Sequence, residues 1–131
     1  MEYRVSQRLR IQPGEYVIDH LPQATVPPST TDWLAAMRAP EGLTIVRPAQ
    51  PADPAASRWV AFYSGQTAHG LDTPGMLAAV VNPLAQAALS VFVASTYHAD
   101  LVLVQADHVQ EAVEALRQVG HIVQNAAEDP A

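Results

Sequence analysis

The chain has 131 residues, a net charge of −6 and no cysteine, which suits one ordinary domain or two very small ones sharing a core. The lack of cysteine excludes disulfides, thiolate metal sites and thiol catalysis. Only seven Lys and Arg residues could meet phosphates, so we expect no nucleic-acid partner. No apolar run approaches the roughly 20 residues of a membrane helix, and the N-terminus lacks a signal-peptide core. We therefore expect a cytoplasmic protein with no membrane contact.

Residues 1–47 are expected to form an N-terminal half made mostly of strands. An alternating segment with Leu9 and Ile11 on one face is followed by the turn signal Pro13-Gly14 and by a second strand from Tyr16 to Leu21. Prolines then interrupt the chain before the segment Thr-Thr-Asp at 30–32, whose residue types favour a helix N-cap.

A short helix carrying Trp33, Leu34 and Met37 is predicted after this cap, and a strand from Leu43 to Val46 after the helix. The segment 48–56 contains three prolines and is expected to be a linker, because proline suits neither a helix interior nor a central strand.

Residues 57–124 predict six elements in the order βαββαβ, the ferredoxin-like arrangement of the α+β class. They are a strand at Trp59–Ser64, a helix beginning at Thr73-Pro74, two strands meeting at 95–100, a helix over Val109–Leu116 and a strand at His121–Gln124. Pro83 lies inside the first helix and is expected to kink or loosen it. Residues 125–131 are expected to form a frayed polar tail.

A polar cluster lies where the two middle strands meet. It consists of Ser95, Thr96, Tyr97, His98 and Asp100, between two apolar runs. If these side chains were buried only for packing, each would need a hydrogen-bond partner. A small-molecule site is a good reason to keep them together.

Four sequence motifs, the first of which contains this cluster, can be compared with known families. They are Ser95-Thr-Tyr-x-x-Asp100-Leu-Val-Leu-Val, the helix Thr-Pro-Gly75-Met ending in Pro-Leu-Ala, the closing Ala-Val-Glu-Ala-Leu-Arg-x-x-Gly120-His121, and the N-terminal Leu-Arg-Ile-x-Pro-Gly-Glu-Tyr-Val with a later Leu-Thr-Ile-Val. Together they resemble the ACT-domain proteins related to the CASTOR arginine sensors and their small bacterial homologues. The resemblance covers most of the chain and is most specific in the second half.

The resemblance implies a ferredoxin-like ACT module over 57–124 preceded by a shortened ACT-like module over 1–47. Such proteins bind an amino acid or a similar effector between modules, which implies a regulatory or sensing role, a homodimer and a regulated protein partner. The matching ligand-binding positions are Gly75 and Met76 at the helix start, with Thr96, Tyr97 and Asp100 at the turn.

The chemistry of these residue types agrees with that implication. Unpaired N–H groups at a helix N-terminus suit a ligand carboxylate, and Gly75 lets a ligand approach the backbone. The carboxylate of Asp100 can accept a charge-assisted hydrogen bond from a ligand cation, on which Tyr97 could stack. A zwitterionic amino acid needs binding groups of both kinds.

His69, His98 and Ala99 depart from the family pattern and leave the ligand open. Each histidine could face solvent, line the pocket, or act as an acid or base oriented by Asp100 or Asp72. The alternative to a non-enzymatic binding protein is therefore a cyclase, isomerase or hydrolase using His69, His98 and Asp100. A pure assembly module is a third reading. The other histidines lack the spacing of metal ligands, so we expect neither a metal nor a cofactor.

Overall fold

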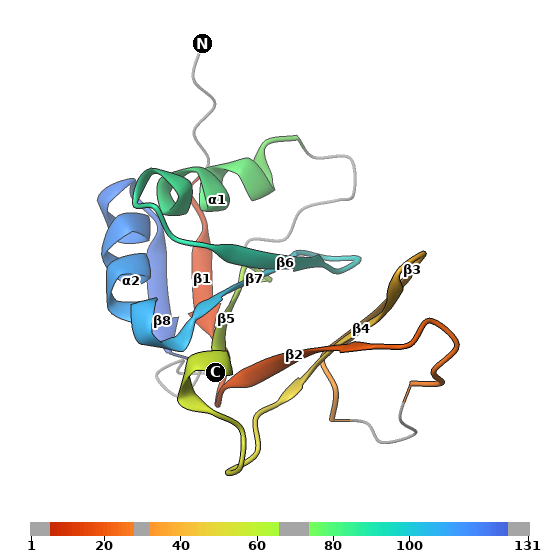
Figure 1. Cartoon of the computed structure of the whole chain (residues 1–131). Helices are drawn as coiled ribbons and strands as arrows, with labels where there is room; N and C mark the ends of the chain where they lie inside the picture. Colours follow the sequence, from red (N-terminus) through yellow and green to blue (C-terminus); the bar gives the residue numbers. More distant parts are fainter. Residues whose placement is uncertain (1–5, 28–31, 66–73, 126–131) are drawn as a thin grey trace.

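The computed structural model describes residues 6–27, 32–65 and 74–125 (Figure 1). Its elements are β1 (Arg8–Ile11), β2 (Tyr16–Leu21), β3 (Ala35–Ala39), β4 (Gly42–Pro48), the 3-10 turn η1 (Ala55–Ser57), β5 (Trp59–Tyr63), α1 (Met76–Gln86), β6 (Val91–Ser95), β7 (Asp100–Gln105), the 3-10 turn η2 (Ala106–His108), α2 (Val109–Gln118) and β8 (Ile122–Asn125). Neither α1 nor α2 is long and apolar enough to cross a membrane.

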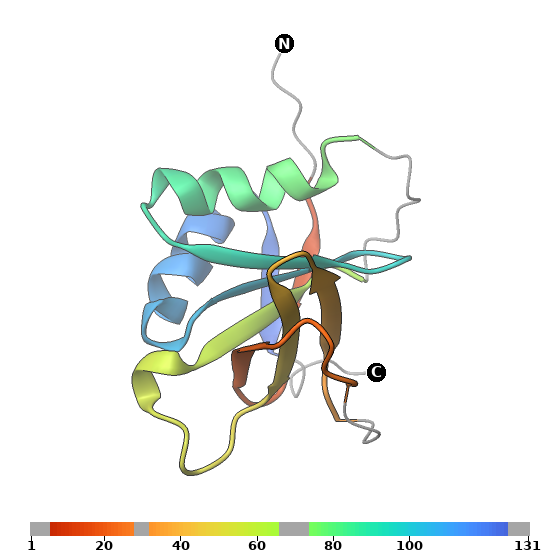
Figure 2. The same ribbon diagram turned by 45° about the vertical axis from the view of Figure 1, so that its right-hand side comes forward.

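The second half of the chain has the predicted ferredoxin-like order. Strand β7 lies between β5 and β6 and is antiparallel to both, with Trp59 opposite Gln105 and Val91 opposite Val104. The helices α1 and α2 cover one face of this sheet (Figures 1 and 2). The α+β class and the ferredoxin-like arrangement are therefore confirmed.

Strand β1 occupies a place in this sheet that the sequence did not reveal. It is antiparallel to β5, with Ile11 opposite Phe62, and parallel to β8, with Arg8 opposite Ile122. A strand from the N-terminal half thus lies between the first and last strands of the βαββαβ unit. Alternation of apolar residues predicts a strand but does not identify its partners, which explains why this position was missed.

A buried apolar layer joins the helices to the sheet. Its buried members are Leu9, Val60, Phe62, Val80, Leu84, Val102, Val104, Ala112, Leu116 and Val123. They include alternate residues of β5 and β7, as expected when side chains at positions i and i+2 share a face. Burial of this set stabilises the packing of α1 and α2 on the sheet.

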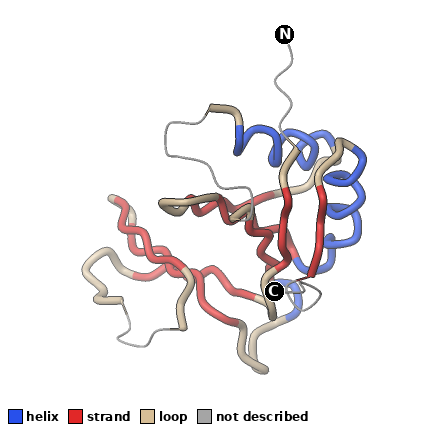
Figure 3. The backbone as a smooth tube through the Cα atoms, turned by 180° about the vertical axis from the view of Figure 1, so that it is seen from behind, coloured by secondary structure: helices blue, strands red, loops and turns tan. Residues whose placement is uncertain are grey.

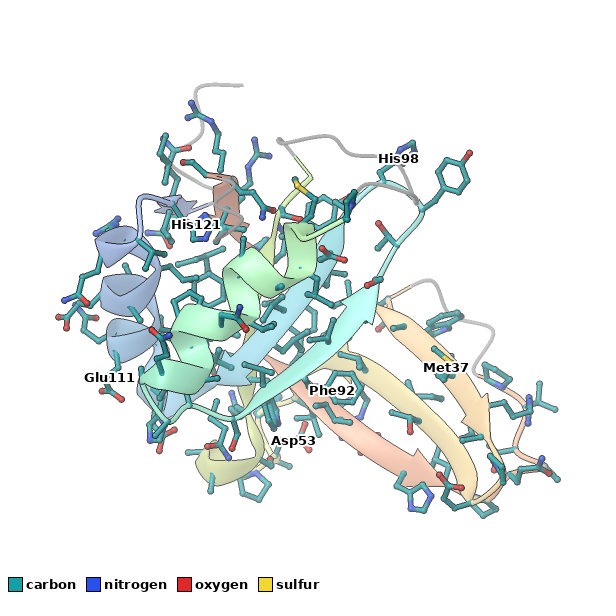
Figure 4. The ribbon with its side chains drawn as sticks, turned by 90° about the horizontal axis from the view of Figure 1, so that it is seen from above. Met37, Asp53, Phe92, His98, Glu111 and His121 are labelled. Atoms are coloured by element: carbon teal, nitrogen blue, oxygen red, sulfur yellow. The ribbon has the colours of Figure 1, made fainter. Side chains whose placement is uncertain are left out.

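The opposite face of the sheet packs on a second layer of strands. Strands β3, β4 and β2 pair antiparallel in that order, and Tyr16 of β2 pairs with Trp59 of β5 (Figure 3). The contact between the layers is formed by Val46, Ala61, Leu101 and Leu103, with partly buried neighbours that include Phe92 (Figure 4).

The helix predicted over Trp33, Leu34 and Met37 is wrong, because Ala35–Ala39 forms strand β3. Every residue of β3 pairs with β4, and the pairing reaches Ala39 opposite Gly42 at a tight turn. Ala, Met and Arg favour helices only weakly as single residues, and tertiary pairing overrides that preference. Gly42 permits the turn, since a Cβ there would lie 2.6 Å from the carbonyl oxygen of Leu21.

Both helices end in the same hydrogen-bonded motif. At the end of α2, the N–H of Gly120 donates to Arg117 and that of His121 donates to Leu116, and Gly120 has a φ of 97°. At the end of α1, Ala88 occupies the equivalent position with a φ of 61°. This left-handed conformation suits glycine and strains alanine.

An ion-pair cluster fastens the linker to the second layer. The guanidinium of Arg47 contacts Asp19 at 2.6 Å and Asp53 at 2.9 Å. Two hydrogen bonds lower the pKa of Asp53 to about 2, and the bond from Arg47 has a larger effect than the bond from the N–H of Gln50. The segment predicted as a linker is therefore held in one conformation by a residue of its own, Asp53.

We predict that Ala88→Gly stabilises the protein by about 1 kcal/mol, because it relieves the strain of a left-handed alanine. Ala88 is exposed, so no packing is lost. Chemical denaturation measures the change. The matched control is Ala87→Gly at a φ of −84°, which should destabilise by about 0.5–1 kcal/mol. Equal destabilisation by both substitutions would contradict the prediction.

We also predict that acid removes the contribution of Asp53. Its pKa is lower in the folded than in the unfolded protein, so the stabilisation is present above about pH 4 and is lost as the pH falls toward 2. Urea midpoints at several pH values should show Asp53→Asn less stable than the parent at pH 6 and nearly equal to it near pH 2. A difference that stays constant across this range would count against the ion pair.

Candidate functional site

The side chain of Asp100 lies on the sheet face covered by the helices. In β7, Val102 and Val104 belong to the core beneath α1 and α2, whereas Leu101 and Leu103 face the second layer. Asp100 has the parity of Val102, so a site built on its carboxylate faces α1 and not the β2–β4 layer. This differs from the expected position of the carboxylate between the two modules.

Two serines lie beside Asp100 in a row across three adjacent strands. Asp100 is 5% exposed, and its Oδ1 accepts a hydrogen bond of 2.8 Å from the hydroxyl of Ser95. The buried hydroxyl of Ser64 accepts a bond of 3.0 Å from the N–H of Asp100. We call Ser64, Ser95 and Asp100 the polar row. Ser64 was not predicted as a site residue. It follows Phe62 by two positions, so the two side chains share a face, and this alternation was the available signal.

Helix α1 begins at the same end of the sheet as the polar row. Helix α1 is the next element after β5 along the chain, and the helix runs back over β6, as Figure 2 shows. The polar row lies at the end of β5, the end of β6 and the start of β7. The described structure thus brings the helix start and Asp100 to one edge of the same layer.

The N-terminus of α1 has the features expected of an anion-binding helix start. Gly75 is the N-cap residue with a φ of 81°, and it forms no side-chain cap. Gly75 therefore offers no side-chain acceptor to the first N–H groups of α1, which are the groups that bind an anion at a helix start. The side chain of Met76 is buried, so Met76 would contact a ligand through its backbone.

The predicted turn residues Thr96, Tyr97 and His98 lie at the tip of the β6–β7 hairpin. The hydroxyl of Thr96 accepts a bond of 3.0 Å from the N–H of Ala99 and therefore serves the turn itself. Tyr97 is 74% exposed, and its ring meets that of His98 edge to face with centroids 5.1 Å apart. Figure 4 shows His98 at this tip.

The contacts do not join His98 and Asp100 into a catalytic pair. The ring of His98 contacts Tyr97, whereas Asp100 accepts from Ser95 and belongs to the helix-covered face. His69, the other candidate acid or base, and Asp72 lie outside the described residues. Within the described ranges, no three His, Asp or Glu side chains are placed to hold a metal ion.

A buried histidine next to α1 was also missed. His121 is 5% exposed, and its Nδ1 accepts the N–H of Gln7 at 3.0 Å while its Nε2 donates to the carbonyl of Ala79 at 2.7 Å. These partners require the neutral ring with the proton on Nε2. Pro83 has no N–H and cannot make the helix bond to Ala79. His121 therefore supplies the hydrogen bond that Pro83 removes from α1.

Comparison with known proteins agrees with this architecture. Residues 55–118 match the family model of the ACT domain, so an ACT domain is found in this part of the chain. It includes β5 through α2 and hence α1 and the polar row. No functionally curated protein matches the chain.

Two solved structures resemble the chain over most of its length. Protein Atu0741 from Agobacterium tumefaciens is 25% identical, with a TM-score of 0.78, covering 92% of this chain and 94% of that one. VC0802 from Vibrio cholerae, described as a protein of unknown function and possible transport protein, is 27% identical with a TM-score of 0.72, covering 85% of this chain and 87% of that one. The N-terminal half is therefore part of a shared fold.

Because His121 replaces the hydrogen bond that Pro83 cannot make, we predict that substitutions at these two residues have coupled effects on the free energy of unfolding. His121→Phe should cost about 1–3 kcal/mol for each buried group it leaves unbonded. In a Pro83→Ala background, the restored N–H bonds Ala79, so the same substitution should cost about 1 kcal/mol less. Denaturation of the four proteins in this cycle measures the coupling. Costs that simply add would show that the Ala79 carbonyl does not link the two residues.

Proposed function

We propose that the protein is a ligand-binding ACT protein with a regulatory or sensing role, and that its ligand is an amino acid or an amino-acid-derived metabolite. An ACT domain indicates a ligand-binding regulatory role in general. The observation that carries the finer proposal is the buried carboxylate of Asp100 at the same edge of the layer as the glycine N-cap of α1. The two groups offer complementary sites to a zwitterion.

In this proposal, the ligand carboxylate binds the N–H groups that follow Gly75. The positive end of the helix dipole favours an anion there, and glycine leaves room for close approach. The ammonium group binds Asp100 by a charge-assisted hydrogen bond, which is stronger than a neutral one. Ser95 keeps the carboxylate in place through its bond to Oδ1.

The hairpin tip and its neighbours complete the proposed site. Thr96 shapes the turn, while the exposed rings of Tyr97 and His98 are available to close over a ligand side chain. His69, which departs from the family pattern, is proposed as a further ligand contact. We propose that ligand binding changes the contacts of a cytoplasmic homodimer with a protein partner, by shifting the population between two conformations.

The proposal predicts that one or more amino acids stabilise the protein against heat. A panel of the proteinogenic amino acids, each at 10 mM, is screened by thermal shift, and binding at about 100 times Kd should add about 2.7 kcal/mol. Calorimetry of any stabilising amino acid then compares two variants that each lose one negative charge.

Asp100→Asn should weaken binding by about tenfold or more, because it removes a charge-assisted bond worth about 1.5–3 kcal/mol. Its amide can still accept from Ser95, so the fold should remain. Asp107→Asn is the matched control, since the Asp107 side chain is 78% exposed in η2. The proposal fails if Asp100→Asn binds as tightly as the parent, or if a bound amino acid is recovered chemically altered, which would favour an enzyme.

A further inference from the structure

Gln7, immediately before β1, connects that strand to β8 and to the start of α1. Its side chain is 1% exposed, and its Nε2 donates a hydrogen bond of 2.7 Å to the carbonyl of Met76. Its own N–H donates to Nδ1 of His121, and its carbonyl accepts the N–H of Ile122 at 2.9 Å. One buried residue of the N-terminal half is therefore bonded to the first residue of α1.

Packing alone does not explain an amide at this position. The Oε1 atom of Gln7 is buried and has no hydrogen-bond partner among the described residues, a condition that costs free energy in a folded protein. Methionine has nearly the same length and volume and would avoid that cost. What methionine would lack is the donor to Met76.

The bond matters because, in the part of the chain that the structure describes, two side chains from outside α1 donate hydrogen bonds to its first turns. Gly75 provides no side-chain cap. Gln7 donates to Met76 and His121 donates to Ala79, and residues three apart lie on the same side of a helix. Any shift of the first turns of α1 away from the sheet must stretch both bonds.

We propose that Gln7 is a positioning residue that couples the start of α1 to the N-terminal half of the protein. Strand β1 leads through the turn after Ile11 into β2, which pairs with β4. A ligand that displaces the first turn of α1 therefore also displaces β1 and the β2–β4 layer. The regulatory meaning of this coupling rests on the function proposed above, whereas the coupling itself is a property of the free protein.

The test uses hydrogen exchange in the ligand-free, full-length protein. Ala78 is exposed in the first turn of α1, and Ala78→Gly loosens that turn. With Gln7 present, this change should raise the exchange rate of the residue 7 amide by about threefold to tenfold. In a Gln7→Met background, the same Ala78→Gly change should raise that rate clearly less, because only the route from Ala79 through His121 to the residue 7 N–H remains.

Gln12→Met is the matched control, because the Gln12 amide donates to the carbonyl of Arg10 and not to α1. In that background the response of residue 7 should persist. An equal response in the Gln7→Met background would overturn the proposal. So would unfolding of both Gln7→Met and Gln7→Leu, since Gln7 would then act only in stability. A null amino-acid screen with intact coupling would refute the proposed function alone.

Discussion

Strand β5 is the element on which both halves of the protein depend. One edge pairs along its length with β7, and the other pairs with β1 and, at Trp59, with β2. Its two faces supply both buried layers, because Phe62 packs under the helices and Ala61 packs against the second layer. Strand β5 is therefore paired along both edges and packed on both faces, and it connects the two halves.

The candidate site follows from the same strand. Ser64 comes directly after β5 and accepts the N–H of Asp100, which sets the start of β7 against the end of β5. The register then places Ser95 opposite Asp100. The carboxylate is thus positioned by backbone pairing that begins in the core, and the helix that follows β5 is brought back to the same edge of the sheet.

Much of the second half could be predicted because its local signals agree with its tertiary role. The apolar run after Asp100 forms β7, and the start at Gly75 fits the left-handed φ found there. The segment Ala35–Ala39 was missed because its helix-favouring residues form a strand through pairing with β4. The type of residue at Gln7 and His121 gave no indication of burial, since their partners are 69 and 42 positions away along the chain.

The residue set of the site was predictable in type but not in placement. Asp100 is buried beside the helix layer, while Tyr97 and His98 of the same polar cluster are at an exposed turn. The direction of a strand side chain depends on parity, which separates residues that are close in sequence. The cluster is consequently divided between a buried carboxylate and a ring pair at the tip of a hairpin.

The most direct test of the account is a map of amide chemical-shift changes on titration with the amino acids of the panel. The account predicts that a binding amino acid shifts the amides that follow Gly75 and those of Ser64, Ser95 and Asp100 most strongly. It also predicts smaller changes that extend through Gln7 into β1. Changes confined to the β2–β4 layer, or no change with any amino acid, would contradict a ligand site between α1 and the polar row.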